Sequence, residues 1–196
     1  MPKQRITKEM VVEAAFTLAR DGGMQEVTVK AIAEKIGCSV QPIYSYCNNM
    51  EGLKRDVTRR AKEFIREYIA LRTDPDDPFR STGRAYIQLT KEEPHLFRIF
   101  ILHQRTGISS LEDLYQSEAN AQIPAFLAKK LGVSMAQAKR LHLDMMIYTI
   151  GIGTIFSVTE PGIPYDEIFA QQERSYQIFL KQVKEDFNEP TNTSML

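Results

Sequence analysis

The sequence predicts an all-α protein in which three short N-terminal helices, spaced as a helix-turn-helix, precede a larger helical domain. Apolar residues recur at helical spacing, as in Val11, Ala15 and Leu18, whereas strand-like alternation is scarce. Capping residues and glycines divide the chain into segments of helical length. With 196 residues, 43% hydrophobic and 26% charged, the chain suits one globular domain, or a small domain joined to a larger one.

Two helices are expected before the tight turn. Thr7 caps the first helix, which Gly22 and Gly23 end. Thr28 caps a second, short helix, which ends at Gly37. Glycine at this position allows the left-handed backbone that a tight turn between two helices needs.

A third short helix is expected directly after this turn. Ser39 caps it, and Pro42 is tolerated in its first turn, where backbone N–H groups lack helical partners. Asn48 and Asn49 are expected to close it. The length and punctuation of the three helices are those of a helix-turn-helix. Its expected core residues are Ala31, Ile32, Ile36 and Ile43.

A long fourth helix is expected over about 50–72, and its length suggests that it ties the small domain to the next one. The segment 74–78, made of Asp and Pro, is the clearest break in the chain. The apolar stripe of the fourth helix consists of Leu53, Val57, Ala61, Phe64, Tyr68 and Leu71.

Five further helices are expected beyond the break. Pro124 kinks or splits the third of them, and Ser134 with Gln137 forms a capping box at the start of the fourth. The helices are expected at about 78–92, 94–104, 109–131, 134–158 and 164–187. We therefore divide the chain into a helix-turn-helix domain at 1–50, a connecting helix at 51–72, a second domain at 73–188 and a polar tail at 189–196.

The zero net charge of the chain hides a division between its two parts. Residues 1–72 contain 13 Lys and Arg against 9 Asp and Glu, a net charge of +4. The remaining residues contain 12 against 16, a net charge of −4. A basic module on an acidic body is typical of a nucleic-acid footprint confined to one end, although +4 over 72 residues is modest.

The residues from Thr28 to Tyr46, with the Ala14-Ala15 pair and the Gly22-Gly23 stop before them, resemble the DNA-binding segment of the TetR family of bacterial transcription regulators. The resemblance covers about residues 7–60. Two positions depart from the family pattern: Cys47 stands where an aromatic residue is usual, and Met50 where a phosphate-binding Lys is usual. Lys54 or Arg55 is a candidate to replace that Lys.

The third helix would present its first turn to base edges in the major groove. Gln41 can pair with adenine through two hydrogen bonds, and Val40 can contact a thymine methyl group. Hydroxyl groups of Tyr44 and Tyr46 suit backbone phosphates. The predicted DNA-binding residues are Thr28, Lys30, Ser39, Val40, Gln41, Tyr44, Ser45, Tyr46 and Lys54.

The resemblance implies that the second domain binds a small effector and forms a homodimer through the helices at about 134–158 and 164–187. The alternative for these helices is that their apolar stripes pack inside one subunit. Aromatic and methionine side chains of this domain suit an adaptable, largely apolar pocket, although each is also compatible with plain core. The candidate effector-binding residues are Phe97, Phe100, Ile101, His103, Tyr115, Met145, Met146, Tyr148 and Phe156.

Other functional classes find little support in the sequence. We expect no membrane span, because the longest apolar stretch, 145–158, is too short, and no signal peptide is visible. The three histidines lack metal-ligand spacing, and we expect no cofactor and no catalytic cluster. Cys38 and Cys47 form no disulfide framework, which fits a cytoplasmic protein; a thiol switch is the alternative to two inert small side chains.

We therefore expect a cytoplasmic, homodimeric repressor of the TetR type that a small apolar effector releases from its operator, and not an enzyme. The alternative is a helical architectural DNA-binding protein or adaptor without an effector.

Overall fold

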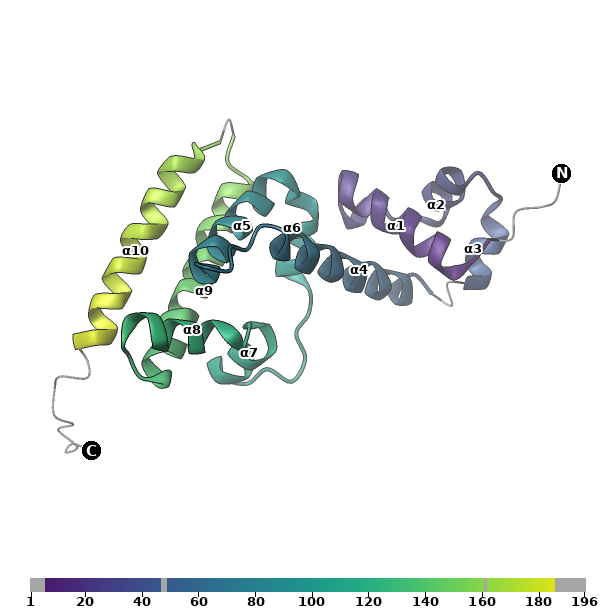
Figure 1. Ribbon diagram of the computed structural model, residues 1–196. Helices are drawn as coiled ribbons and strands as arrows, with labels where there is room; N and C mark the ends of the chain where they lie inside the picture. Colours follow the sequence, from purple (N-terminus) through teal and green to yellow (C-terminus); the bar gives the residue numbers. More distant parts are fainter. Residues whose placement is uncertain (1–5, 47–48, 161, 186–196) are drawn as a thin grey trace. The chain divides into compact units, whose positions relative to one another are not determined.

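The computed structural model describes residues 6–46, 49–160 and 162–185, and this part of the chain contains helices and no strand. Cys47, Asn48 and the predicted tail at 189–196 lie outside the described residues. The helices of the first half are α1 (Lys8–Gly22), the 3-10 turn η1 (Met24–Glu26), α2 (Val29–Ile36), α3 (Val40–Tyr46) and α4 (Met50–Ala70) (Figure 1). They are followed by α5 (Pro78–Glu92), α6 (Pro94–Leu102), α7 (Leu111–Glu118), α8 (Gln122–Leu131), α9 (Met135–Ser157) and α10 (Tyr165–Glu185).

The chain forms two compact units. The first contains the residues up to Leu71 together with Leu89–Gln104, so that α6 belongs with α1 to α4. The second contains Arg72–Gln88 and the residues from Arg105 onward. Because Leu89–Gln104 joins the first unit, the boundaries of the two compact units differ from those of the predicted domains. The division into functional domains stays a prediction.

Side-chain caps start the helices of the first unit. The hydroxyl of Thr7 accepts a hydrogen bond from the backbone N–H of Met10 at 3.3 Å, and the prediction that it caps α1 is confirmed. Thr28 caps α2 in the same way. Asn49, which we expected to close the third helix, instead caps α4, because its side-chain oxygen accepts the N–H of Gly52 at 2.6 Å.

One apolar core holds the first unit together. Fully buried Val11 of α1, Ile32 of α2, Ile43 of α3 and Val57 of α4 pack in a single cluster. The predicted stripe of α4 is correct except at its end. Leu71 is 84% exposed, because α4 ends at Ala70 and the chain leaves the helix there.

Polar contacts fix α6 and the residues before it within the first unit. The guanidinium of Arg20, on α1, donates both from Nε and from an NH2 group to the Glu93 carboxylate, with Nε–O distances of 3.1 and 2.8 Å. The carboxylate of the preceding residue, Glu92, accepts a hydrogen bond from the hydroxyl of Tyr68 at 2.7 Å. At the other end of α6, Lys62 Nζ lies 2.9 Å from His103 Nε2.

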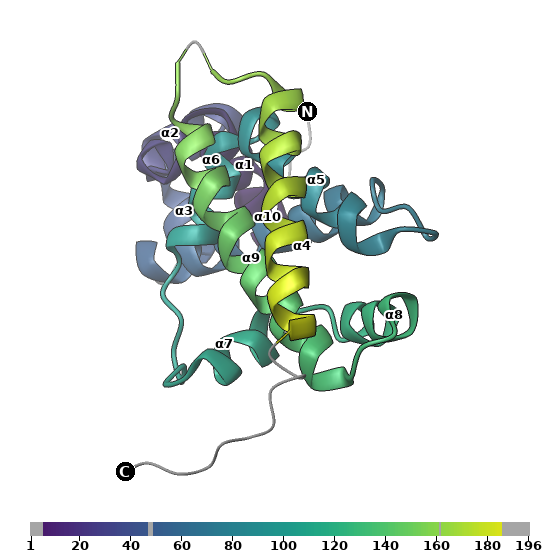
Figure 2. The same cartoon turned by 90° about the vertical axis from the view of Figure 1, so that its left-hand side faces the viewer.

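The second unit is built around α9 and α10, which run side by side in opposite directions (Figures 1 and 2). The predicted capping box at the start of α9 is confirmed, since Ser134 and Gln137 bond each other's backbone N–H. The predicted helix at 109–131 is split into α7 and α8. The break falls at residues 119–121, before Pro124, which lies in the first turn of α8.

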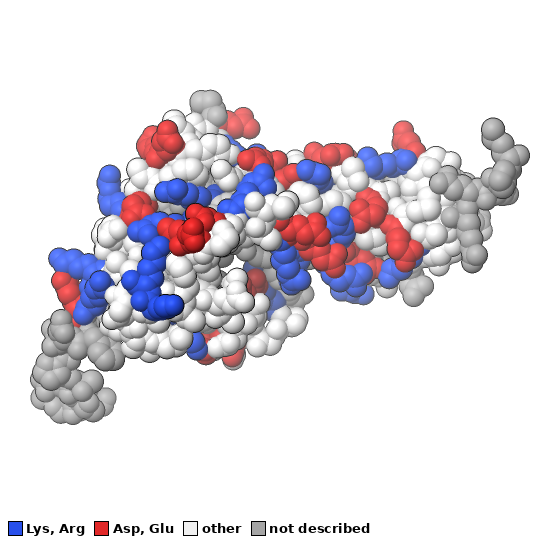
Figure 3. All heavy atoms as spheres, viewed as in Figure 1, with Lys and Arg blue, Asp and Glu red and all other residues white. Residues whose placement is uncertain are grey.

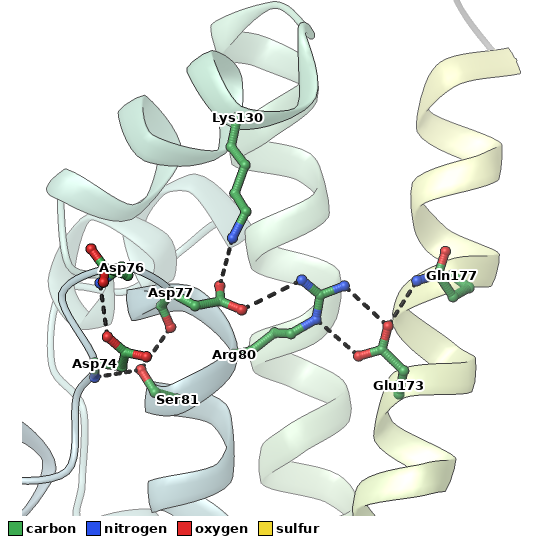
Figure 4. A network of polar contacts seen from close by, with 8 residues as sticks. All are labelled: Asp74, Asp76, Asp77, Arg80, Ser81, Lys130, Glu173 and Gln177. Atoms are coloured by element: carbon green, nitrogen blue, oxygen red, sulfur yellow. Dashed lines mark hydrogen bonds and ion pairs between the residues drawn. The ribbon is translucent and has the colours of Figure 1, made fainter.

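A polar network ties the start of α5 to α10 (Figure 4). Arg80 donates to both oxygens of Glu173, at 2.9 and 3.1 Å, and its guanidinium lies over the ring of Tyr176. The Asp77 carboxylate forms ion pairs with Arg80 and with Lys130 of α8. None of the helices within the described ranges is long and apolar enough to cross a bilayer.

Candidate nucleic-acid interface

The turn between α2 and α3 depends on Gly37. Its φ of 76° and ψ of 38° lie in the left-handed region, and an added Cβ would meet no neighbour within 4 Å. The N–H of Gly37 and that of Cys38 close the end of α2 on the carbonyls of Glu34 and Ala33, at 3.1 and 2.9 Å. Glycine is therefore needed for its backbone conformation, not for close packing.

Helix α3 has one buried side and one open side. At about 100° per residue, Val40, Gln41, Tyr44 and Ser45 fall within an arc of about 140°. All four are exposed, with Val40 at 43% and Tyr44 at 64%, while Ile43 on the other side is fully buried. The open side therefore presents four of the predicted DNA-binding residues together.

Tyr46 points away from that group. On the same helical wheel it lies about 140° from Gln41 and about 160° from Tyr44, towards α1 and α4. Together with Lys8, Asn49 and Arg55 it lines a hollow of about 190 Å³. The structure thus groups Tyr46 with the start of α4, apart from the residues on the open side of α3.

Ser39 does not cap α3 as expected. No hydrogen bond of its hydroxyl occurs within the described part of the chain. The third helical position of α3 is Pro42, which has no backbone N–H for a cap to bind. The exposed Ser39 hydroxyl therefore keeps its hydrogen-bonding capacity for another partner.

The remaining predicted DNA-binding residues lie on α2 and α4. Thr28 and Lys30 are exposed, and the Thr28 hydroxyl is already an acceptor for the N–H of Ala31. Lys54 is half-buried, and its Nζ lies 3.4 Å from a carboxylate oxygen of Glu51.

The family model described as bacterial regulatory proteins, tetR family, matches residues 11–57, which span α1 to the first half of α4. This part of the chain is therefore similar to the DNA-binding region of the tetR family. Within the matched residues, the helix-turn-helix is formed by α2, the turn at Gly37 and α3.

Two solved structures share the fold over nearly the whole chain. One is a TetR-like transcriptional regulator from Rhodococcus sp. RHA1, with a TM-score of 0.61 and 15% identity over 90% of this chain and 99% of that one. The other, a transcriptional regulator from Rhodococcus sp. Rha1, has a TM-score of 0.58 and 12% identity over 90% and 97%. A search of curated proteins gives no match. The structural likeness confirms the all-α fold expected of a tetR regulator.

The predicted effector-binding residues are divided between the two units. Phe97, Phe100, Ile101 and His103 belong to the first unit and the other five to the second. Within the second unit, Met145 and Tyr148 share a cluster with Tyr176, whereas Phe156 packs in another cluster with Ile87 and Ile168. Which of these residues meet an effector stays a prediction.

The sequence interpretation missed one buried polar pair in the second unit. Tyr115, on α7, has its hydroxyl 2.9 Å from Nδ1 of His142 on α9, and the rings meet edge to face. Burial lowers the pKa of His142 to about 4 and raises the pKa of Tyr115 to about 12, so both side chains are neutral near pH 7. Only the helical position of His142, one turn before Met146, could have placed it near the predicted pocket residues.

The outer side of α9 and α10 carries apolar residues that stay exposed among the residues the structure describes. Ile147 and Ile155 of α9 are 47% and 64% exposed, and Ile178 of α10 is 59% exposed. An added Cβ at Gly151, between the first two, would meet nothing within 4 Å. A hollow of about 360 Å³ adjoins this side, lined mainly by Ile152, Ile155, Phe156, Ile163 and Ile168.

Proposed function

We propose that this protein is a tetR regulator, a homodimeric repressor whose two α3 helices bind a pseudo-palindromic operator, and that a small, largely apolar effector releases it. The observation that carries the proposal is the open side of α3, where Val40, Gln41, Tyr44 and Ser45 stand exposed on a helix anchored by buried Ile43. A helix of this kind fits the major groove of B-DNA.

Each residue of the open side suits a separate part of the duplex. The Gln41 amide can donate to N7 and accept from N6 of one adenine, and Val40 beside it can contact a thymine methyl group. Tyr44 and Ser45 offer hydroxyl groups to phosphates or base edges. Sequence preference therefore depends mainly on Gln41, and Tyr44 strengthens binding to any duplex.

The uncovered side of α9 and α10 supports dimerisation. Ile147, Gly151 and Ile155 follow one another at four-residue spacing, so they form a single stripe along α9. Packing among the described residues of one subunit does not explain this stripe, because the two isoleucines remain exposed and a Cβ added at Gly151 would meet no atom within 4 Å. If a second copy of the chain packs antiparallel against this side, the stripe of each copy is buried, and α9 and α10 of the two copies form a four-helix bundle.

The connectivity supports control of the first unit by the second. The chain passes between the units at residues 71–72, 88–89 and 104–105. The segment from Leu89 to Gln104 is inserted into the first unit, where Glu93 is held by Arg20 of α1. An effector in the second unit would act on α1 and α4 through these passages, within the limit set by its different affinities for the two states.

Two substitutions on α3 test the DNA-binding half of the proposal. With the duplex enriched from a randomised library as operator, Gln41→Ala is expected to lower the preference for operator over random DNA about ten- to a hundredfold. Tyr44→Phe is expected to weaken binding to both duplexes alike. Gln122→Ala, an exposed change on α8, is the control. If neither α3 variant alters operator affinity, the assignment of α3 is wrong.

The effector half needs a separate measurement. Operator affinity of the full chain is compared with and without a small-molecule extract of its natural cell. Loss of binding that follows a single extract fraction supports effector release. Unchanged binding with every fraction would favour an architectural protein or adaptor that keeps the fold.

A further inference from the structure

We propose that Arg55, on the second turn of α4, is the residue that grips a DNA phosphate beside α3, in place of the Lys that the family usually has at position 50. The inference rests on the proposed binding of DNA by α3 and names a further positioning residue for it. It depends on three observations: the packing of Met50, the ion pairs of the neighbouring cations, and the place of Arg55 next to Tyr46.

Met50 cannot supply the missing contact. Its side chain carries no charge, and it is partly buried against the core cluster formed by Val11, Ile43 and Leu53. The position has therefore become part of the apolar core, and any charged contact with DNA at this end of α4 must come from another residue.

Several cations of the first unit are already paired with carboxylates. Lys8 and Arg59 both bond Asp56, at 2.9 and 2.8 Å, and Arg60 bonds Glu13 at 2.7 Å. Arg20 and Lys35 pair with Glu93 and Asp21. Figure 3 shows the two signs of charge interleaved on the face that it displays. These pairs leave the net charge of +4 in residues 1–72 unchanged, but they reduce the number of cations that are free to contact phosphates.

Lys54 is poorly placed to take the role that the sequence suggested for it. It is half-buried, and its Nζ is 3.4 Å from Glu51. Arg55 is exposed and makes no ion pair or hydrogen bond within the described ranges. Of the two candidates, Arg55 is the one whose charge is uncompensated.

Arg55 also stands where a phosphate contact would help α3. It lines one hollow together with Tyr46, the last residue of α3. The carboxylate in that hollow, Asp56, is compensated by Lys8 and Arg59, and the hydrogen bond from Lys8 is the main reason that its pKa lies below the usual range. The remaining charge is the guanidinium of Arg55, whose planar fork of donors matches two phosphate oxygens.

The test compares two arginines of the same helix. Arg66 follows Arg55 by eleven residues, which is about three turns, so it lies about 16 Å further along nearly the same face of α4. It too is exposed and without an ion pair within the described ranges. Arg55→Gln and Arg66→Gln therefore remove the same charge from the same face and differ in distance from α3.

Dissociation constants for operator and random duplex are measured between about 50 and 200 mM salt. Arg55→Gln is expected to weaken binding to both duplexes by about ten- to a hundredfold and to reduce the salt slope of a dimer by about 2, because each subunit loses one phosphate contact. Arg66→Gln is expected to leave the slope unchanged. Arg55→Lys retains the charge, so it is expected to keep the slope while losing part of the affinity.

The outcomes separate this inference from the proposed function. If Gln41→Ala and Tyr44→Phe act as expected while Arg55→Gln leaves the slope unchanged, the inference is overturned and DNA binding by α3 stands. Equal losses for Arg55→Gln and Arg66→Gln would also overturn it, because they would reflect net charge alone. Far-UV circular dichroism of each variant checks that the helices are intact.

Discussion

Removal of Arg20 is expected to destabilise the protein more than removal of its partner Glu93. The two side chains form one ion pair, but the carboxylate side chain is only 10% exposed and the guanidinium side chain 44%. Arg20→Met leaves a nearly buried carboxylate without its donors. Glu93→Gln leaves an arginine that water can still reach and an amide that can still accept a hydrogen bond.

The difference in burial sets the magnitudes. Breaking a fully buried pair costs about 3–5 kcal/mol, and an exposed pair contributes about 0–1 kcal/mol. Because the arginine is nearly half exposed, we expect a loss of unfolding free energy below the range for a fully buried pair: about 2–3 kcal/mol for Arg20→Met and about 1 kcal/mol for Glu93→Gln. Arg20→Met also loses the contact of the guanidinium with the ring of Phe64, 4.8 Å from its centroid.

Urea unfolding followed by circular dichroism measures both costs, with the double variant completing the cycle. At a slope of about 2–3 kcal/mol per molar, Arg20→Met should lower the urea midpoint by about 1 M. Lys181→Met, which breaks an exposed pair with Glu185, is the control. Equal costs for the two substitutions, or a larger cost for Glu93→Gln, would contradict the burial argument and the anchoring of α6 by this pair.

Two further predictions concern the second unit. His142 has a pKa of about 4 in the folded protein against 6.5 when exposed, so only the unfolded state takes up its proton as the pH falls from 6.5 to 4, and stability should decline by up to about 3 kcal/mol. Urea midpoints at pH 7 and 4.5 measure this decline in stability. His142→Gln keeps a hydrogen-bonding partner for Tyr115 and should remove the share of the decline that His142 causes. An identical decline in the variant would show that His142 is not its source. Ile155→Lys is expected to convert the proposed dimer to monomers in sedimentation velocity, whereas Leu71→Lys, at a residue 84% exposed, should not. A dimer that survives Ile155→Lys would place the interface elsewhere.

Local signals in the sequence predicted most of the helix starts. Thr7, Thr28 and Ser134 bond backbone groups three residues away, so their roles can be inferred without knowing the tertiary structure. The same reasoning predicted a cap at Ser39, and this prediction was wrong because Pro42, three residues later, has no backbone N–H for the serine hydroxyl to bind. Asn49 was placed on the wrong side of a boundary, since asparagine both ends and starts helices.

Long-range packing accounts for what the sequence left open. Arg20 and Glu93 are 73 residues apart, and nothing in the local pattern indicates that α6 joins the first unit. The helical periodicity that selected Met145, Tyr148 and Phe156 identifies buried faces, but it does not say which cluster each face joins. The same limit hid the pair of Tyr115 and His142. The charge count likewise revealed a basic module without showing which cations are paired.

Selection from a randomised duplex library with the full chain tests the central claim most directly. The account predicts enrichment of two inverted half-sites whose centres lie about 34–36 Å apart, or a multiple of that, and substitution of Gln41 should relax one position in each half-site. Enrichment of no sequence, or of a single site without symmetry, would contradict operator recognition by a dimer through α3.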